Sequence, residues 1–405
     1  MQTNFVEQYA NTASGREAEE ILRKCVHCGF CNATCPTYQL LGDELDGPRG
    51  RIYQIKEIFE GAIPTVEVQN HLDRCLTCRA CESTCPSGVD YGRLADIGRK
   101  VVEDAVGRTP LQAVVRRLLV LVIPNRRIFG ALVRMGQWFR PVLPKVLRSK
   151  VPLPSTGGIW PAPHHTRRML VLEACGQPAA TPNVNSATAR VLDRLGISLL
   201  AAQEAGCCGA VAHHLSDHDR ALLAMQNNID AWWPHIEAGA ESIVITASGC
   251  GVMVKEYGYL LADNPDYAEK ARRISALCKD VAQVLSTEDL SALKLNAKEA
   301  VAFHCPCTLQ HGQKLSGVTE KLLQTLGFEL KPVANGHICC GSAGTYSILQ
   351  PALSQQLLSD KVAALEASGA PVIATANVGC QLHLSTATNT PVKHWIELVD
   401  QAINT

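Results

Sequence analysis

The sequence predicts an α+β protein, in which a mainly helical N-terminal domain precedes two copies of an α/β unit with a parallel sheet. Two observations predict this arrangement. A run of four cysteines occurs twice in the first hundred residues, with an offset of 50 residues. Farther along, a set of four cysteines that includes a CCG triplet recurs at offsets of 130 or 132 residues, which indicates an internal duplication. The predicted domains are residues 1–107, 108–165, 166–296 and 297–405.

The composition is that of a folded protein rich in cysteine. The chain has 405 residues, 46% hydrophobic and 19% charged, and its formal net charge of zero does not favour nucleic acid as a partner. Residues 1–20 lack the pattern of a secretory signal, and the apolar run 118–123 is too short to span a bilayer. We therefore expect a cytoplasmic chain, in which 18 cysteines favour metal binding over disulfides.

The two N-terminal cysteine runs carry the clearest chemical signal. Residues 25–36 (CVHCGFCNATCP) and 75–86 (CLTCRACESTCP) both match C-x2-C-x2-C-x3-C-P, the run that binds [4Fe–4S] clusters in bacterial ferredoxins. Three cysteines of such a run bind one cluster, and the fourth ligates the neighbouring cluster. We expect one cluster at Cys25, Cys28, Cys31 and Cys85, and the other at Cys75, Cys78, Cys81 and Cys35. Two clusters indicate an electron relay.

Structural zinc sites are the alternative for these runs. Zinc usually takes two cysteine pairs or a mixture of cysteine and histidine, and His27 lies between cysteines that already suffice as ligands. We therefore favour iron and sulfide. Between the runs, a turn at 46–50 leads into a helix, where Arg49 and Arg51 either balance cluster charge or are solvated.

The segment after the first domain is strongly basic. From Ala105 to Leu172 there is no Asp or Glu, whereas Lys and Arg occur 12 times among apolar residues and Trp138 and Phe139. This basic bridge either lies on an anionic membrane or a partner subunit, or links two domains with its arginines solvated. Prolines and glycines at 151–165 then indicate a linker.

The remaining sequence alternates between strand-like and helix-like stretches in both copies, which is typical of a parallel sheet covered by helices. The expected helices include residues 221–233 and 351–368. The expected strands are 169–174, 196–202 and 242–247 in the first copy and 301–304, 328–333 and 371–376 in the second.

A cysteine follows each of these strands. The two sets are Cys175, Cys207, Cys208 and Cys250, and Cys305, Cys339, Cys340 and Cys380. Because the carboxyl ends of parallel strands meet at one edge, we expect each set to converge there, where it could hold a further cluster. Buried free thiols are the alternative, which we favour for Cys278 alone, and Cys307 is a fifth ligand or a spare. The nearby histidines, expected to be polar surface or hydrogen-bonding residues, are His213, His214, His304, His311, His337 and His383.

These motifs together resemble the iron–sulfur subunits of flavin-linked hydroxyacid dehydrogenases over essentially the whole chain. The segments CCGSAGTYSILQP (339–351) and IATANVGCQLHL (373–384) are most similar to glycolate oxidase (glycolate dehydrogenase) iron–sulfur subunits. Lactate-utilisation proteins, the iron–sulfur subunit of anaerobic glycerol-3-phosphate dehydrogenase and heterodisulfide reductase are more distant. Heterodisulfide reductases end each unit with C-x-x-C, where this chain has Met253 and His383, so a five-cysteine cluster is not expected in the first unit.

The resemblance implies a division of labour between subunits. A partner subunit that carries FAD would oxidise glycolate to glyoxylate. It would also accept D-lactate as a second substrate. This chain would contain no catalytic residue and would pass electrons through its clusters to a quinone-type respiratory acceptor, at the cytoplasmic face of the inner membrane. The alternatives are an iron–sulfur subunit of a lactate or glycerol-3-phosphate dehydrogenase, and a heterodisulfide-reductase-like enzyme that reacts at its CCG units.

Overall fold

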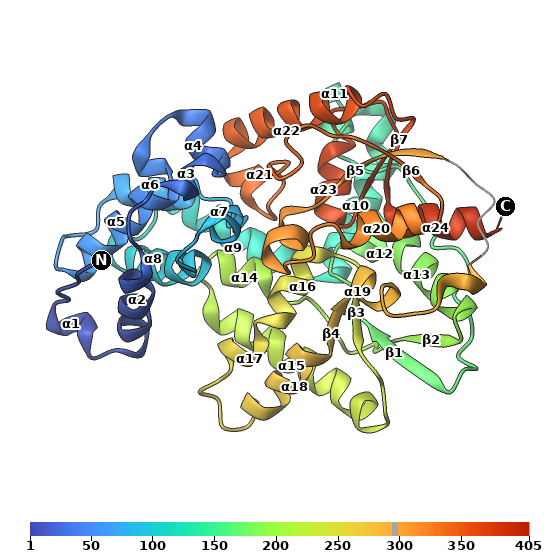
Figure 1. The fold of residues 1–405 in the computed structure, drawn as a ribbon, viewed down its shortest axis with the longest axis horizontal. Coiled ribbons are helices and arrows are strands. Elements are labelled where there is room, and N and C mark those ends of the chain that lie inside the picture. The colour runs from blue at the N-terminus through green and yellow to red at the C-terminus, as the bar shows by residue number, and fades with distance from the viewer. Residues whose placement is uncertain (294–298, 405) are drawn as a thin grey trace. The chain divides into compact units, whose positions relative to one another are not determined.

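The computed structural model describes residues 1–293 and 299–404, and the predicted domain boundary between residues 296 and 297 lies outside them. The chain forms two compact units. Unit 1 comprises Met1–Arg117 and His337–Leu357, and unit 2 comprises Leu118–Gly336 and Leu358–Thr405. Unit 1 is helical and unit 2 contains two parallel sheets, so the predicted fold class is confirmed (Figure 1).

Unit 1 consists of short helices joined by the cysteine-bearing loops. Its core is formed by one face each of α2 (Ala13–Lys24), α5 (Pro48–Phe59), α6 (Val66–Asp73) and α8 (Tyr91–Val106). The buried side chains include Leu22, Ile55, Phe59, Leu72 and Leu94. Two longer helices, α9 (Pro110–Val122) and α22 (Pro351–Glu366), each contain a boundary between the units. The other elements are α1 (Glu7–Ala10), α2 (Ala13–Lys24), α3 (Phe30–Ala33), α4 (Pro36–Leu41), η1 (Glu44–Asp46), α5 (Pro48–Phe59), α6 (Val66–Asp73), α7 (Ala80–Thr84), α8 (Tyr91–Val106) and α21 (Tyr346–Leu349).

Unit 2 shows the internal duplication directly. Its two four-stranded sheets have the orders β2-β1-β3-β4 and β6-β5-β7-β8, which are the same topology, and every strand pair is parallel. The strands are β1 (Arg167–Val171), β2 (Ile197–Ala201), β3 (Ile243–Ile245), β4 (Cys278–Asp280), β5 (Ala300–His304), β6 (Glu329–Lys331), β7 (Val372–Thr375) and β8 (Val392–His394).

Six of these strands fall where the sequence predicts them. The edge strands β4 and β8 were not predicted, because each has three residues and a lysine at its centre, too short and too polar for a recognisable pattern. Cys278 begins β4 and is buried, as expected of a structural thiol. The predicted helix 221–233 lies within α15 (His218–Glu237), and the predicted helix 351–368 begins with α22 but extends two residues past its end at Glu366. No helix or strand interrupts the linker at 151–165.

The helices of unit 2 cover the two sheets. Their bounds are α10 (Arg126–Phe139), η2 (Arg140–Val142), α11 (Lys145–Arg148), α12 (Gln177–Ala180), α13 (Asn183–Arg194), α14 (Ala210–His214), α15 (His218–Glu237), α16 (Ser248–Lys255), α17 (Tyr257–Leu260), α18 (Ala268–Leu277), α19 (Val281–Leu285), η3 (Leu290–Ala292), η4 (Thr308–Gly312), α20 (Val318–Thr325), α23 (Val378–Leu384) and α24 (Trp395–Asn404). Among the described residues, we find no helix whose length and apolar character would let it cross a bilayer.

One hydrophobic core joins the two α/β copies. Residues of both sheets, such as Val171 and Val301, belong to a single buried cluster, together with the α13 and α24 side chains that pack between them. Arg190 on α13 forms a bidentate ion pair with Asp400 on α24, with Nη2–Oδ2 at 2.7 Å and Nε–Oδ1 at 3.0 Å. The duplicated units are therefore held as one body by apolar packing and a partly buried ion pair.

This ion pair gives a test of how the copies are joined. We expect Asp400→Ala to lower the free energy of unfolding by about 2 kcal/mol, because Arg190 loses its carboxylate in a partly buried site. Urea denaturation of the full chain measures this. In the exposed pair of Glu269 and Arg272, Glu269→Ala should cost less than about 0.5 kcal/mol, and equal losses in the two variants would contradict the interpretation.

Candidate functional site

The two N-terminal cysteine runs fold into the same backbone shape. Each run follows a helix, α2 or α6, and leads into a short helix, α3 or α7. In the first loop His27 and Gly29 have positive φ (56° and 82°), and Thr77 and Arg79, 50 residues later, also do (52° and 60°). A left-handed backbone at two positions per loop is unfavourable for side chains other than glycine, so its repetition indicates a functional constraint on the loop.

The first run meets one cysteine of the second. Burial and, to a smaller extent, the nearby thiols of Cys25, Cys28 and Cys85 raise the pKa of Cys31 to about 11. The same thiols line one cavity. The group consists of Cys25, Cys28, Cys31 and Cys85. Three residues of the first loop and the last cysteine of the second therefore surround a common space.

A second group forms the reciprocal arrangement. It consists of Cys75, Cys78, Cys81 and Cys35, since the pKa of Cys81 is raised by burial and then by the other three thiols. Cys35 directly precedes α4, which begins at Pro36. Helices α3 and α7 lie beside each other, so the fourth cysteine of each run is carried toward the other loop.

Two buried arginines stabilise negative charge in the second group. Burial alone would raise the pKa of Cys75, but Arg51 and Arg99 bring it below its usual value. Arg99 donates to the Cys75 carbonyl oxygen at 2.6 Å. The Cys75 sulfur also accepts hydrogen bonds from the Tyr91 hydroxyl at 3.5 Å and from the Thr77 backbone N–H at 3.4 Å. The site therefore favours a thiolate, the form that binds metal.

The sequence left two roles open for Arg49 and Arg51, which were charge balance at the clusters or solvation in a turn. The structure distinguishes the two arginines. The side chain of Arg51 is 1% exposed and donates to the His71 carbonyl and the Thr37 hydroxyl. The side chain of Arg49 is 37% exposed and forms an ion pair with Glu44 at 2.6 Å. The hydrogen bond to Glu44 raises the pKa of Arg49, and the charge of the nearby Cys31 thiol makes a smaller contribution in the same direction. Only Arg51 is part of the buried site.

The first CCG set converges at the edge of its sheet. Cys175 follows β1, Cys207 and Cys208 follow β2, and Cys250 lies on α16 after β3. Hydrogen bonds link Cys175 to Cys207, Cys207 to Cys208, and Cys208 to Cys250. The bonds from Cys175 and Cys208 lower the pKa of Cys207 to about 3. Four thiols from three strand ends therefore form one group, with a thiolate favoured at its centre.

The glycine of each CCG triplet is required by the backbone. Gly209 and Gly341 have φ of 89° and 84°, which side chains rarely adopt. A Cβ at Gly341 would lie 2.5 Å from the Ser354 carbonyl oxygen, and one at Gly209 would lie 3.1 Å from the Ala221 carbonyl oxygen. The tight turn that presents two adjacent cysteines is thus possible only with glycine in third place.

Residues distant in sequence hold the first CCG turn. Asn228, fully buried, accepts from Gly206 N–H at 2.7 Å and donates to the Cys207 carbonyl at 2.9 Å. Tyr257 donates to the Cys208 carbonyl at 2.9 Å. No sequence pattern indicated Asn228 and Tyr257, or Tyr91 and Arg99, because each contacts a cysteine loop through a pairing that no local motif encodes.

The second CCG set is distributed between the units. Cys339 and Cys340 are buried in unit 1, where Gly341 N–H donates to the Cys339 sulfur at 3.4 Å. In the same segment Tyr346 donates to the Arg74 carbonyl at 3.0 Å, directly beside Cys75. Burial and then the Cys75 charge raise the pKa of Tyr346, to which Cys339 also contributes. The second CCG turn is therefore fixed against the second ferredoxin-type loop.

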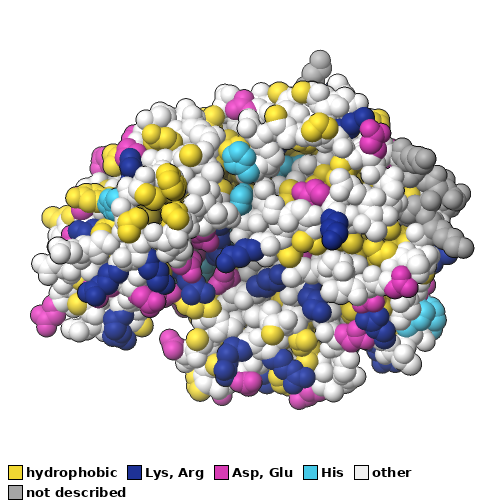
Figure 2. Space-filling view, viewed as in Figure 1, with side chains coloured by type: hydrophobic (Ala, Val, Ile, Leu, Met, Phe, Trp, Pro, Cys, Tyr) yellow, Lys and Arg dark blue, Asp and Glu magenta, His cyan; other side chains and the backbone are white. Residues whose placement is uncertain are grey.

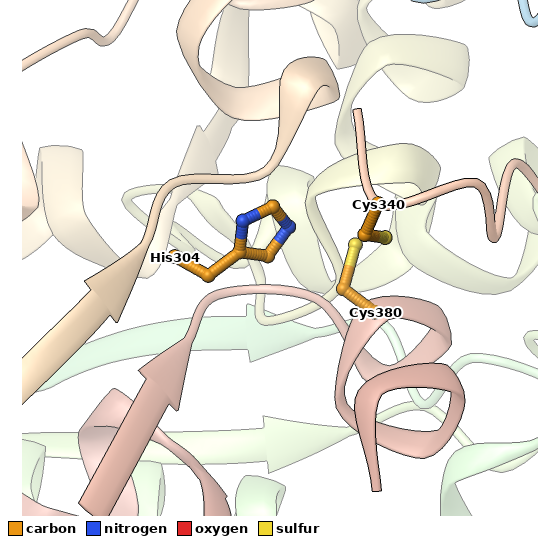
Figure 3. A group of neighbouring side chains, drawn as sticks. All are labelled: His304, Cys340 and Cys380. Atoms are coloured by element: carbon orange, nitrogen blue, oxygen red, sulfur yellow. The ribbon is translucent and has the colours of Figure 1, made fainter. Parts of the chain in front are cut away.

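The other two members of this set lie in unit 2. Cys305 follows β5 and is hydrogen-bonded to Glu320. Cys380 lies on α23, and its sulfur accepts from the Asn377 amide at 3.5 Å. A ring nitrogen of His304, the last residue of β5, lies within 4.8 Å of the Cys380 sulfur (Figure 3).

His304 differs from its expected role as a polar surface or hydrogen-bonding residue. It is fully buried, and neither ring nitrogen has a hydrogen-bond partner within 1–293 and 299–404. Burial, with a smaller contribution from Lys361, lowers the pKa of His304 to about 3, so the ring is neutral at physiological pH. A neutral imidazole is a metal ligand.

Families of known domains match three stretches of the chain. A 4Fe-4S dicluster domain matches residues 21–89, and a cysteine-rich domain (CCG) matches residues 169–255 and 301–385. Over 405 residues, 100% of this chain and 99% of the relative, the sequence is 55% identical to the glycolate oxidase iron–sulfur subunit of Escherichia coli strain K12. The chain belongs to the family of glycolate oxidase iron–sulfur subunits.

More distant relatives agree with this membership. A probable glycolate oxidase iron–sulfur subunit of Bacillus subtilis strain 168 is 31% identical over 411 residues, 94% of this chain and 92% of the relative. Lactate utilization protein A of Shouchella clausii is 31% identical over 50% of this chain and 84% of its own length. A hypothetical protein from Helicobacter pylori has the same fold, with a TM-score of 0.57 at 10% identity over 98% of this chain and 74% of that one.

The chain is thus a subunit of an oxidoreductase that binds iron–sulfur clusters, two of them of the [4Fe–4S] type. The residues present fit such groups. The two thiol groups of unit 1 offer four soft ligands each. In the second group, Arg51 and Arg99 place positive charge beside the ligands.

The hydrogen bond from Tyr91 to Cys75 gives a prediction about this environment. A donor to the sulfur stabilises the reduced, more negative state, so we expect Tyr91→Phe to lower one reduction potential by about 40 mV, for a bond of about 1 kcal/mol. A redox titration followed by EPR measures this. Tyr267→Phe, which removes a surface bond to Asp230, should change neither potential, and a rise in potential in Tyr91→Phe would contradict the prediction.

Proposed function

We propose that this chain is the electron-transfer subunit of a flavin-linked glycolate dehydrogenase, which converts glycolate to glyoxylate. The observation that carries the proposal is the pair of four-thiol groups in a chain 55% identical to a glycolate oxidase iron–sulfur subunit. Electrons come from FAD on a partner subunit and go to a quinone-type respiratory acceptor. When bound, [4Fe–4S] clusters accept and donate one electron at a time.

The ligands follow from the two thiol groups. Cys25, Cys28, Cys31 and Cys85 hold one cluster, and Cys75, Cys78, Cys81 and Cys35 hold the other. Arg51, Arg99 and Tyr91 favour negative charge at Cys75, so the second cluster lies in the more positive environment. These residues therefore tune potential rather than take part in bond making.

Oxidation of the hydroxyacid belongs to the partner. Conversion of glycolate to glyoxylate releases two electrons and two protons. FAD on the partner would take up both electrons and return the protons to solvent on reoxidation, and this chain would receive the electrons one at a time. This chain receives the electrons in residues 1–107 and contributes no catalytic residue. The CCG units, 166–296 and 297–405, provide the sites for any further cluster.

An exposed apolar surface lies beside the first thiol group. Cys28 is exposed, and the neighbouring Val26 and Phe30 are 67% and 60% exposed. Hydrophobic side chains are visible on the face of unit 1 shown in Figure 2. We assign this surface to the flavin-bearing partner, because apolar groups around a cluster site exclude water when a second subunit covers them.

D-Lactate is the second substrate in the proposal. Lactate utilization protein A relatives share about half of this chain with 31% identity, which supports lactate as the alternative hydroxyacid. Substrate choice lies with the partner subunit, so the alternative leaves the roles of the eight cysteines unchanged.

The basic bridge (108–165) is proposed to contact the cytoplasmic face of the inner membrane. On α10, Ile128, Leu132, Met135 and Phe139 follow helical spacing and are all exposed, and Trp138 is 79% exposed. The segment has no acidic residue, so its surface is complementary to anionic lipid headgroups. Helix α9 repeats the pattern with exposed residues at 111, 114, 118 and 121. Peripheral contact would bring the chain to a quinone.

The cross-ligation is tested by serine variants of the full chain purified without oxygen. We expect Cys85→Ser to disturb the same EPR signal as Cys28→Ser, and a different one from Cys78→Ser, because Cys85 completes the first group. Cys278→Ser, a buried thiol outside every set, serves as the control and should retain both signals. If Cys85→Ser instead removes the signal lost in Cys78→Ser, the assignment of ligands is wrong.

Membrane contact is tested by co-sedimentation with phospholipid vesicles. With anionic vesicles at low salt, replacing Arg127 and Arg134 by Gln should weaken binding about 30-fold, at about 1 kcal/mol per basic residue. The matched control replaces Arg220 and Arg272 by Gln, which makes the same charge change elsewhere on unit 2. Equal binding of wild type to anionic and zwitterionic vesicles would refute the proposed contact.

A further inference from the structure

Two strands of the second sheet end in fully buried histidines that differ in their partners. At the end of β8, His394 Nε2 bonds to the Thr246 carbonyl at 2.9 Å, and its Nδ1 accepts from Ile396 N–H at 3.3 Å. At the end of β5, neither nitrogen of His304 is bonded within the part of the chain that the structure describes. A buried polar group without a partner costs about 1–3 kcal/mol, a cost that a bound ligand at His304 would offset.

His304 and Cys305 have different neighbours. His304 is the last residue of β5, and Cys305 follows the end of the strand. The Cys305 thiol is hydrogen-bonded to the Glu320 carboxylate, whereas a His304 nitrogen lies within 4.8 Å of the Cys380 sulfur (Figure 3). Histidine can serve beside cysteine as a ligand of an iron–sulfur cluster, as in Rieske [2Fe–2S] centres, so this pair of residue types suits such a group.

The first copy uses the other residue of the corresponding pair. There Ala174 occupies the position of His304, and Cys175 is hydrogen-bonded to Cys207 within its thiol group. In the second copy the residue that faces the sheet edge is the histidine. The duplicated units have therefore diverged in the strand-end residue that they direct toward the adjacent cysteine.

We propose that His304, rather than Cys305, is the strand-end ligand of an iron–sulfur cluster in the second CCG unit, with Cys380 as a thiolate ligand beside it. The proposal extends the electron relay by one centre and rests on the proposed electron-transfer function. Replacing a thiolate by neutral imidazole removes negative charge from a cluster and raises its potential. Such a centre suits the acceptor end of a relay.

The test uses the full chain, purified without oxygen from cells grown with [15N]histidine. Metal analysis should give more than the about eight irons of two [4Fe–4S] clusters, and pulsed EPR should show 15N coupling in a signal distinct from theirs. His304→Ala should lose that signal and its iron and keep about eight irons. His304→Cys should restore the iron without the nitrogen coupling and at a lower potential.

Two matched variants separate ligation from damage to the fold. Cys305→Ser changes the adjacent residue, and His394→Ala removes a buried histidine of the same sheet whose nitrogens are bonded within the protein. Both should retain the nitrogen-coupled signal, and unchanged ferredoxin-type signals report that each variant is folded.

Several results would overturn the inference. These are a wild type with no more than about eight irons, zinc in place of the additional iron, a third cluster without nitrogen coupling, or loss of the signal in Cys305→Ser. In each case the two ferredoxin-type clusters can still be reduced by the flavin partner. Failure of the proposed electron-transfer function is recognised separately, by clusters that the partner and glycolate do not reduce.

Discussion

The Arg51 guanidinium and the Asp46 carboxylate, both buried, hold the second cysteine loop in place. Asp46 bonds to His71 Nδ1 at 3.0 Å and to Arg74 at 2.8 Å, while Arg51 donates to the His71 carbonyl at 2.7 Å. These contacts fix the end of α6, from which the loop of Cys75 begins. A buried ion pair adds little net stability by itself, because desolvation offsets the attraction. Its effect here is positional, since it places a permanent positive charge beside thiolates that would otherwise repel one another.

The same problem has a different solution in the first CCG unit. A chain of hydrogen bonds distributes the charge among its four thiols, with a smaller contribution from Arg126, so that Cys207 is favoured as a thiolate while the pKa values of Cys175 and Cys208 are raised. Backbone groups of the turn are satisfied by Asn228 and Tyr257. The glycine of the triplet allows this turn, which explains why two adjacent cysteines that could not easily bridge each other are followed by glycine in both copies.

The sequence predicted most of the fold because its signals are local or periodic. Cysteine spacing placed the thiols in the two loops, and apolar runs placed six strands. The supporting residues could not be predicted in this way. Arg99 and Tyr91 come from α8, after the second run, and their bonds to the loop of Cys75 depend on how helices pack. His304 was misjudged because a histidine after a buried strand looks the same in sequence whether or not its ring finds a partner.

Duplication followed by divergence accounts for the asymmetry between the CCG units. The first keeps all four cysteines within one body, joined by direct hydrogen bonds. In the second, Cys339 and Cys340 lie on a segment that packs in unit 1, with Tyr346 bonded to the backbone beside Cys75. This hydrogen bond positions the segment of the second CCG turn against the loop of Cys75. The segment 337–357 of the second copy is therefore fixed within unit 1 by Tyr346, whereas the turn of the first copy has its own supports in Asn228 and Tyr257, so the two CCG turns are under different physical constraints.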